Sequence, residues 1–453
     1  MKILLIDPPG QGNTHRFFPL GLMYVQAYLK CHGYPATFLR RLGRTDSSLV
    51  QEQLEDLEPD VVGITCLTGN HRQTLYLAEM IKAHRPKIRL VLGGHHATFM
   101  RKQILDAYPF VDHIVRGEGE VSFKELLDSF VSGDTGRPVA GVSGRDEQGV
   151  VVDGPARPPI VDLDALPFPC YDDVQDMCRT AKGFPILASR GCPFACSYCA
   201  GTAYYGHVRR QRSVDNIIAE MRYLKSMRGP GEVTFFDDFL TADIEHSREL
   251  FDRIAKEQFG FALVLQTRLD HLDADLLLKM KKAGVTQIWF GLESGSKELL
   301  KSVNRSWEYE KVLLMVRESA RLGIMTRAKV LIGLPSENWR ALMATAQMLT
   351  ALNPYVFQVL CYVVMPGTAV YEKLKSSGEI ADDHWLKESR HIVYLSLKRG
   401  WLARPLFHGG VLFLMAAFLW STRSWRRVFS VLYCRVAYEI SCAKMLLANV
   451  FCR

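Results

Sequence analysis

A chain of 453 residues, 48% hydrophobic and 23% charged, is long enough for two or three folded domains and is not composed like a disordered or fibrous protein. Its formal net charge is +8, but from Leu395 onward there are nine Lys or Arg residues and a single acid, Glu439, so the whole excess belongs to the tail. The body is close to neutral, which argues against a nucleic-acid-binding body.

The first 131 residues alternate short apolar runs with helical patterns. Strands are predicted at residues 2–6, 60–65, 89–92 and 112–115, and helices at 20–31, 71–83 and 119–130. This alternation predicts a parallel, doubly wound α/β sheet, which binds ligands beyond the carboxyl ends of its strands. The first apolar run ends at Asp7, too soon for a signal peptide, so we expect a cytoplasmic protein.

Three glycine-containing turns each follow a predicted strand. Thr65 ends another predicted strand. The turns are Asp7-Pro8-Pro9-Gly10, Gly93-Gly94-His95-His96-Ala97-Thr98 and Arg116-Gly117-Glu118-Gly119-Glu120. Glycines at these places let the backbone approach a large ligand closely. Each turn alone is weak evidence, because glycine is common wherever a strand leads into a helix.

Residues 135–183 are rich in Gly, Pro and Asp and indicate a short hairpin followed by an extended connector. We therefore expect a linker there, between a first domain at residues 1–134 and a second domain at residues 184–380.

The sequence Cys192-Pro-Phe-Ala-Cys196-Ser-Tyr-Cys199 places three thiols within one short loop. They can bind three irons of a [4Fe–4S] cluster, whereas a cluster held entirely by protein takes four cysteines, so one iron is left open for a small molecule. The alternatives are a zinc site with a distant fourth ligand and incidental core thiols. Zinc sites usually use a second pair of cysteines, and the remaining eight cysteines are scattered.

Apolar strand candidates recur from residue 186 with helices between them, which predicts a partial barrel of six βα units. The strands are predicted at residues 186–189, 232–236, 263–267, 286–291, 328–333 and 357–363. Barrel chemistry sits at the carboxyl ends of strands. The cysteine loop, Asp237-Asp238, Arg268 and Glu293-Ser294 all follow such ends.

Beyond about residue 382 the barrel pattern stops, and a helical tail is expected. Residues 406–420 are mostly apolar, are too few to span a bilayer, and are flanked by Arg404, Arg423, Arg426 and Arg427. This pattern fits a helix lying on an anionic membrane surface. The alternative is a helical cap on the barrel with the arginines in solvent.

The cysteine loop, with Tyr198 before its last cysteine, resembles that of the radical S-adenosylmethionine (SAM) enzymes. The Gly291-Leu-Glu-Ser-Gly-Ser296 and Gly333-Leu-Pro-Ser-Glu337 segments resemble barrel motifs of the same family. The turns at Gly93 and Gly117 resemble those of its cobalamin-dependent subfamily, and the whole resemblance covers residues 1–380. It implies a Rossmann-like cobalamin-binding domain, a TIM-like (β/α)6 barrel and three cofactors: a [4Fe–4S] cluster, SAM and cobalamin.

The resemblance also implies roles for particular residues. Cys192, Cys196 and Cys199 would hold the cluster, and Glu293, with Ser294, would accept the ribose hydroxyls of SAM. The remaining SAM contacts would be Tyr198 along the adenine, Asp237 or Asp238 at the ammonium group or the substrate, and Arg268 or Arg327 at the carboxylate. A solvated acid at a helix start is the alternative for Glu293, and surface salt bridges are the alternative for the arginines.

Cobalamin contacts are expected from the turns of the first domain. They are Asp7, Thr65, Gly93, Gly94, His95, Thr98, Gly117, Glu118, Gly119 and Glu120. The Asp-x-His-x-x-Gly motif, which supplies an axial histidine in many cobalamin proteins, is absent, because Asp112-His113 lacks the spacing. We therefore expect no axial histidine from the protein.

By resemblance, an adenosyl radical takes hydrogen from an unactivated carbon of a lipid or secondary metabolite, and methylcobalamin delivers a methyl group. The alternative is a cobalamin-dependent cyclase or rearrangement enzyme without net methyl transfer. A non-catalytic iron–sulfur protein is a third interpretation. Expected partners are a small-molecule or lipid substrate and an electron donor such as flavodoxin or ferredoxin, without nucleic acid.

Overall fold

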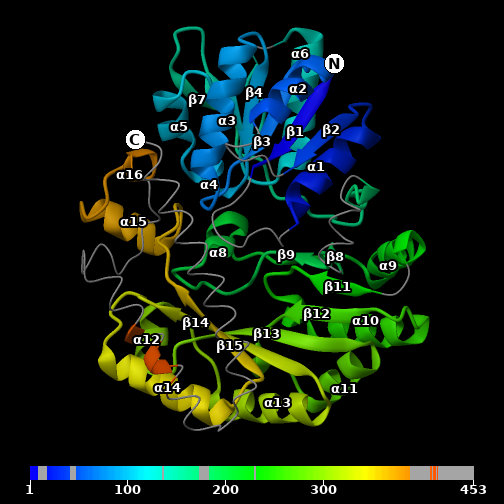
Figure 1. Cartoon of the computed structure of the whole chain (residues 1–453), viewed down its shortest axis with the longest axis vertical. Coiled ribbons are helices and arrows are strands. Elements are labelled where there is room, and N and C mark those ends of the chain that lie inside the picture. The colour runs from blue at the N-terminus through cyan, green and yellow to red at the C-terminus, as the bar shows by residue number, and fades with distance from the viewer. Residues whose placement is uncertain are drawn as a thin grey trace. The chain divides into compact units, whose positions relative to one another are not determined.

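The computed structural model describes residues 1–8, 18–40, 47–134, 137–172, 183–228, 231–387, 409–410, 412–414 and 416 (Figure 1). The chain forms two compact units. Unit 1 comprises Met1–Met177 and Tyr371–Arg390, and unit 2 comprises Cys178–Val370 and His391–Arg453.

Unit 1 is built on a seven-stranded sheet. In spatial order the strands are β2 (Ala36–Arg40), β1 (Ile3–Asp7), β3 (Val61–Thr65), β4 (Arg89–Gly93), β5 (His113–Val115), β6 (Val142–Arg145) and β7 (Val151–Asp153). The first five are parallel and the last two are antiparallel. The chain order reverses between β1 and β3, and this is where doubly wound sheets bind their ligands.

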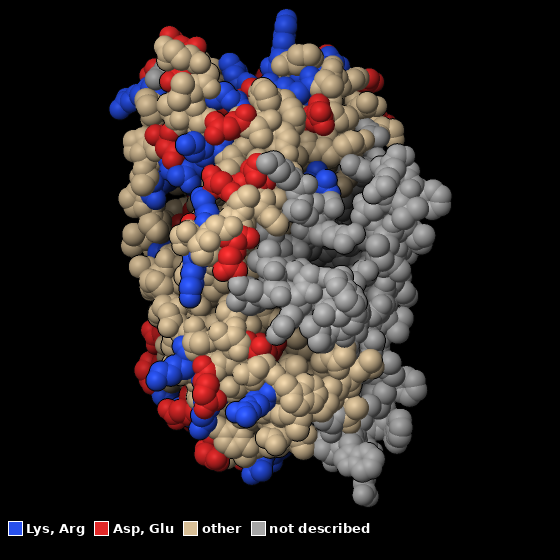
Figure 2. All heavy atoms as spheres, turned by 90° about the vertical axis from the view of Figure 1, so that its left-hand side faces the viewer, with Lys and Arg blue, Asp and Glu red and all other residues tan. Residues whose placement is uncertain are grey.

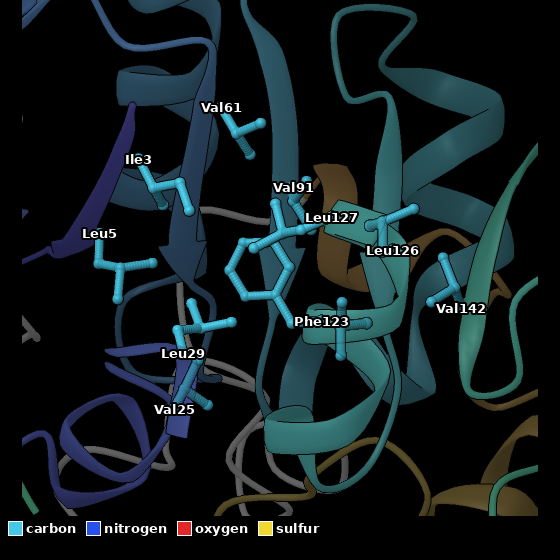
Figure 3. Close-up of a cluster of buried hydrophobic side chains, with 11 residues drawn as sticks. Ile3, Leu5, Val25, Leu29, Val61, Val91, Phe123, Leu126, Leu127 and Val142 are labelled. Carbon is cyan, nitrogen blue, oxygen red and sulfur yellow. The ribbon is translucent and has the colours of Figure 1, made fainter. Parts of the chain in front are cut away.

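Helices cover this sheet on both faces, as right-handed crossovers require. They are α1 (Leu20–Cys31), α2 (Ser47–Leu57), α3 (His71–His84), α4 (His95–Phe99), α5 (Arg101–Ala107) and α6 (Gly119–Ser132). Helices α1 and α6 pack side by side, and Phe123 of α6 lies in a cluster of buried side chains drawn from the sheet and both helices (Figure 3). Gly63 leaves room beneath it, because a Cβ there would lie 2.9 Å from the Leu5 side chain and 3.2 Å from the Phe123 ring.

Two segments join unit 1 that the predicted boundaries place elsewhere. The predicted hairpin forms as β6 and β7, but it extends the sheet through β5, and Val142 enters the core cluster. Trp385, 1% exposed, packs edge-on against His71 and His96 with ring centroids 5.5 and 5.7 Å apart. The observed division therefore differs from the predicted boundaries at 134, 183 and 380, because strand pairing and apolar burial cross them.

Unit 2 contains a six-stranded parallel sheet, as the βα pattern predicts. Its strands lie side by side in the same order as in the chain. They are β8 (Gly183–Ile186), β11 (Glu232–Phe235), β12 (Ala262–Gln266), β13 (Val285–Glu293), β14 (Met325–Ile332) and β15 (Val356–Cys361). The prediction for the first strand is displaced. Strand β8 ends at Ile186, and β9 (Ser189–Arg190) pairs antiparallel with β10 (Arg210–Gln211).

The helices of unit 2 follow these strands. They are α8 (Ala200–Tyr205), α9 (Val214–Arg228), α10 (Ile244–Glu257), α11 (Ala274–Lys282), α12 (Lys297–Ser302), α13 (Tyr309–Arg321) and α14 (Trp339–Leu352). Helix α15 (Ala369–Ser376), from Tyr371 on, and helix α16 (His384–Lys387) belong to unit 1. The predicted cap of α9 is confirmed, because the Ser213 hydroxyl accepts the Asn216 N–H at 3.1 Å. Its predicted apolar face, which includes Ile217 and Leu224, is fully buried.

The described part of the predicted apolar tail helix packs on unit 2. Leu414 is completely buried, and the ring of Phe413 lies 4.7 Å from that of Trp339 in α14. Residues 417–453, with most of the basic side chains of the tail, lie outside the described residues. Within the described ranges, no helix combines the length and apolarity needed to cross a bilayer. Figure 2 shows acidic and basic side chains interspersed over the described surface of one face.

Candidate active site

The cysteine loop connects β9 to α8 near the carboxyl end of the parallel sheet. Its three cysteines are free thiols, and the Cys199 N–H bonds the Cys196 carbonyl at 3.1 Å. The Ser197 N–H bonds the Val303 carbonyl at 3.1 Å, which ties the loop to the segment after α12. The loop is therefore held at the end of the sheet where barrel chemistry occurs.

The chemistry of this loop fits an iron–sulfur cluster. Burial raises the pKa of the Cys192 and Cys199 thiols, so a cation is needed to stabilise their thiolates. Across the described ranges, no three His, Cys, Asp or Glu side chains converge on one point where a single metal ion would sit. A cubane does not require such convergence, because each thiolate binds a different iron.

Glu293 and Tyr198 meet at the end of β13. Tyr198 and Glu293 lie close enough to affect each other's pKa, and Arg305 lies 3.9 Å from the Glu293 carboxylate. Arg305 also donates to the Gly291 carbonyl, and it interacts electrostatically with Cys196. Burial raises the pKa of Glu293, which the charges of Arg305 and Lys329 oppose. Arg305 thus connects the predicted ribose acceptor with a predicted cluster ligand.

A local distortion of β13 places the Glu293 carboxylate. The pairing with β14 shifts register between Gly291 and Glu293, and Glu293 has a φ of 60°. The side chain turns back over the strand, because a Cβ on Gly291 would lie 2.2 Å from Glu293 Oε1. Only glycine at residue 291 leaves room for this carboxylate.

The two predicted aspartates have different surroundings. Asp237 is 2% exposed and accepts the Ala188 N–H at 3.1 Å and the Ser189 hydroxyl, which fixes the turn before the cysteine loop. Burial raises the pKa of Asp237 to about 6. Asp238 has an accessible side chain, yet the surrounding protein raises its pKa, a combination typical of a group that faces a concave surface. The structure thus leaves Asp238, not Asp237, available to a ligand.

The predicted arginines do not lie together. Arg268 pairs with Asp270 at 2.6 Å, donates to the Ser306 carbonyl, and lies 4.1 Å from the ring centroid of Phe194 in the cysteine loop. Arg327 lies on β14 opposite Trp289, four residues along β13 before Glu293. Because the register shift pairs Glu293 with Val330, Arg327 lies three residues of β14, about 10 Å at 3.3 Å per residue, below Glu293. Neither arginine stands beside the cysteines with a free guanidinium, which disfavours both as SAM carboxylate ligands.

Ser294 and Glu337 complete this end of the sheet. Ser294 is fully buried, and its hydroxyl lies 3.1 Å from that of Thr345 in α14, so it positions the strand end. Glu337 accepts the Gly333 N–H at 2.6 Å, and burial raises its pKa to about 7. The sequence motif that contains Glu337 predicted no role for Glu337, and Arg305 was not predicted at all. The only signal for Arg305 in the sequence is that a basic residue follows shortly after the Glu293 motif.

In unit 1 Asp7, Thr65 and the turns at Gly93 and Gly117 follow or end β1, β3, β4 and β5, and residues 9 and 10 of the first predicted turn lie outside the described residues. The Thr98 hydroxyl accepts the Gly117 N–H at 3.0 Å and donates to the Gly94 carbonyl at 2.9 Å, which joins two of the turns. A Cβ at Gly117 would meet no atom within 4 Å, so the backbone there is open to a large ligand. This open edge fits cobalamin.

Other predicted cobalamin contacts already have structural partners. Gly94 has a φ of 97°, and a Cβ on it would lie 3.0 Å from the Cys66 carbonyl oxygen, so the turn requires glycine. The Glu118 carboxylate accepts the Ile160 N–H at 2.8 Å, and Glu120 is buried. Burial lowers the pKa of His95 to about 4, so its ring is neutral at pH 7.

Comparisons with known proteins identify both units. Residues 14–127 match the B12 binding domain, and residues 186–349 match the Radical SAM superfamily. The chain is 28% identical to an uncharacterized methyltransferase of Pyrococcus horikoshii, over 85% of this chain and 86% of the relative. It is 29% identical to the anaerobic magnesium-protoporphyrin IX monomethyl ester cyclase of Rubrivivax gelatinosus, over 84% of this chain and 71% of the relative.

A solved structure shares the fold of most of the chain. The radical S-adenosylmethionine methyltransferase TsrM from Kitasatospora setae superposes with a TM-score of 0.72 and 19% identity, covering 83% of this chain and 76% of that one. A three-cysteine loop on a partial barrel, preceded by a B12-binding sheet, defines an iron–sulfur enzyme that uses two organic cofactors. The chain belongs to the cobalamin-dependent radical SAM enzymes, and its cofactors are a [4Fe–4S] cluster, SAM and cobalamin.

Proposed function

We propose that this enzyme transfers a methyl group to an unactivated carbon of a small-molecule substrate. The observation that carries the proposal is the presence, in one chain, of a B12-binding domain and a radical SAM domain with a three-cysteine loop. The methyltransferase relative of P. horikoshii, aligned over most of both chains, supports methyl transfer. When bound, SAM and the cluster supply radical chemistry, and cobalamin supplies the methyl group.

The residues of unit 2 divide into those that bind and those that position. Cys192, Cys196 and Cys199 hold the cluster, and Glu293 accepts the ribose hydroxyls of SAM beside Tyr198. Asp238, with its accessible carboxylate, is the contact for the SAM ammonium group. Three other predicted residues hold the binding groups in position. Asp237 fixes the turn before the cysteine loop, Arg268 packs on Phe194 within the loop, and Ser294 positions the end of β13.

In unit 1 the open glycine turns receive cobalamin. Gly93, Gly94 and Gly117 offer backbone to the cofactor, together with the side chains of Asp7, Thr65, His95 and Thr98 at the same strand ends. Glu118, Gly119 and Glu120 support the third turn, because Glu118 holds Ile160 and a Cβ on Gly119 would lie 3.2 Å from Val25.

A second candidate function is ring formation without net methyl transfer. It is favoured by the relative from R. gelatinosus, a cyclase that aligns over 84% of this chain. The products separate the two functions. Methyl transfer releases S-adenosylhomocysteine alongside 5′-deoxyadenosine, whereas cyclisation releases 5′-deoxyadenosine alone.

The tail supports a further proposal, peripheral contact with a membrane that would present a lipid substrate. Trp339 is 59% exposed and Leu412 is 51% exposed in the region where the tail helix packs on α14. Basic residues flank this helix in the sequence, as anionic lipid surfaces require. A cytoplasmic location and a flavodoxin or ferredoxin as electron donor fit an enzyme with a thiolate-bound cluster.

Anaerobic reconstitution with iron, sulfide and hydroxocobalamin tests the main proposal. We expect cobalamin absorption that stays with the protein, and dithionite-dependent conversion of SAM to 5′-deoxyadenosine. The triple variant Cys192→Ala, Cys196→Ala, Cys199→Ala should lose the cluster and SAM cleavage. Cys31→Ala, at an exposed thiol, should keep both. SAM cleavage that survives in the triple variant would refute the proposal.

A further inference from the structure

The two faces of the unit 2 sheet differ in polarity. On β14, Thr326, Ala328, Val330 and Ile332 are buried, and the alternate residues point to the opposite face. That opposite face carries Arg327 and Lys329 on β14, Trp289 on β13 and Gln266 on β12. A core would place apolar side chains here, so the inner face of this barrel is built for a polar ligand.

Two cations flank one indole ring on this inner face. The Arg327 guanidinium carbon and the Lys329 Nζ each lie 5.1 Å from the ring centroid of Trp289. Lys329 donates to the Gln266 side-chain oxygen, a neutral acceptor. The Arg327 Nε and the Trp289 Nε1 are buried and make no hydrogen bond within the described residues. These three side chains therefore have unused hydrogen-bond donors, at Arg327 Nε and Trp289 Nε1, and no unused acceptor.

The two acids near Arg327 and Lys329 do not neutralise their positive charges. Glu293 forms its ion pair with Arg305 and acts on Lys329 only through its charge. Glu232, at the start of β11, feels the charge of Arg327, but burial raises the pKa of Glu232. Within the described ranges neither Arg327 nor Lys329 forms an ion pair with a carboxylate. Both cations are half-buried, and burial lowers the pKa of Lys329, so an anion placed beside the two side chains would stabilise their charged forms.

We propose that Arg327, Lys329 and Trp289 bind an anionic group, a carboxylate or a phosphate, of the substrate. The inference rests on the proposed function in taking the barrel interior as the substrate site, and it adds the chemical class of the substrate. SAM also carries a carboxylate, but the cysteine loop that would hold SAM lies at the carboxyl end of the sheet. Arg327 lies about 10 Å deeper along β14 than the level of Glu293.

The test uses the reconstituted full-chain enzyme with inorganic phosphate and acetate as anionic probes. We expect either probe to raise the melting temperature of the wild type more than chloride does at equal ionic strength. The double variant Arg327→Gln, Lys329→Met should bind the probe at least about tenfold more weakly, because a charge-assisted contact is lost at each residue. Lys329→Arg should retain binding. Far-UV circular dichroism checks that each variant folds.

The matched control is Arg317→Gln, Arg321→Gln, which removes two exposed positive charges from α13 of the same unit. It should keep the stabilisation by phosphate or acetate. Equal stabilisation of the wild type, the double variant and the control would overturn the proposal, because the effect would then be a general one of salt.

Binding of SAM distinguishes the two sources of the anionic group. For the double variant we expect a SAM dissociation constant within about twofold of the wild type. A tenfold loss for SAM with no loss for decarboxylated SAM would assign the cations to the SAM carboxylate and overturn the proposal. Neither measurement depends on turnover, so a wild type that binds phosphate but does not cleave SAM would count against the proposed function alone.

Discussion

Arg305 connects the cluster loop with the SAM-binding end of the sheet. Its guanidinium donates to the Gly291 carbonyl, lies 3.9 Å from Glu293 and interacts electrostatically with Cys196. A fixed positive charge beside one cluster thiolate favours the reduced cluster, because hydrogen bonds and charges at the sulfurs set the potential of an iron–sulfur centre.

Replacing Arg305 by methionine removes this charge and donor while leaving a long side chain. We expect the reduction potential of the cluster to become more negative by on the order of tens of millivolts. Redox titration followed by electron paramagnetic resonance measures the change. Arg305→Lys should recover part of it, and Arg321→Gln, at an exposed arginine, should leave the potential unchanged. A wild-type potential in an Arg305→Met variant that retains its cluster would contradict this role.

At the scale of a single element, the pairing of β13 shifts register twice, with β12 near its start and with β14 at its end. The strand pairs with β12 and β14 along its length, and the shift between Gly291 and Glu293 turns the Glu293 carboxylate back over the strand. Left-handed backbone at a non-glycine residue costs energy, and such strain is commonly found at functional sites. The absence of a side chain at Gly291 is what makes room for the carboxylate.

Gly291→Ala should therefore displace Glu293 without unfolding the barrel. We expect the dissociation constant of SAM to rise about tenfold and the melting temperature to fall by only a few degrees. Equilibrium dialysis with labelled SAM and calorimetry measure the two effects. The control is Gly21→Ala in α1, where a Cβ meets no atom within 4 Å. SAM affinity unchanged in Gly291→Ala would show that the turn of Glu293 does not serve SAM.

At the scale of the whole molecule, the chain returns to unit 1 at Tyr371–Arg390, between two segments of unit 2. Within this segment Trp385 is buried against the stacked rings of His71 and His96. His96 follows directly from the glycine turn of β4, and its Nδ1 lies 3.2 Å from the Thr68 hydroxyl. A segment from the far end of the sequence therefore supports the cobalamin-binding edge of the sheet.

Trp385→Ala should destabilise unit 1 by about 3–5 kcal/mol, the usual cost of removing a buried tryptophan side chain. Retention of cobalamin through gel filtration should fall with it, because the residues beneath the indole carry the β4 turn. Urea unfolding followed by cobalamin absorption measures both. Trp339→Ala, at an exposed tryptophan, should cost less than about 1 kcal/mol. Equal effects of the two substitutions would disprove the supporting role of Trp385.

Local patterns predicted most elements and could not predict their partners. Helix α1 occupies the predicted residues 20–31, and Ser213 caps α9 as predicted, because periodicity and caps are encoded within a few neighbouring residues. The hairpin of β6 and β7 was also predicted, but its pairing with β5 depends on a strand far back in the chain. Strand β2 and helices α2, α4 and α5 were missed, and α4 and α5, of five and seven residues, are too short to show a helical period.

The sequence by itself determined the chemistry. The spacing of the three cysteines and the glycine turns at strand ends is local, and the two domain families follow from it. Only the tertiary structure decided what individual charged residues do. It paired Arg268 with Asp270, buried Asp237 beneath the cysteine loop, brought Arg305 to Cys196 and set Arg327 beside Trp289. The physical reason is that the protonation and pairing of a charged side chain depend on its burial and on its partners in space. The neighbouring residues in the sequence determine neither of these.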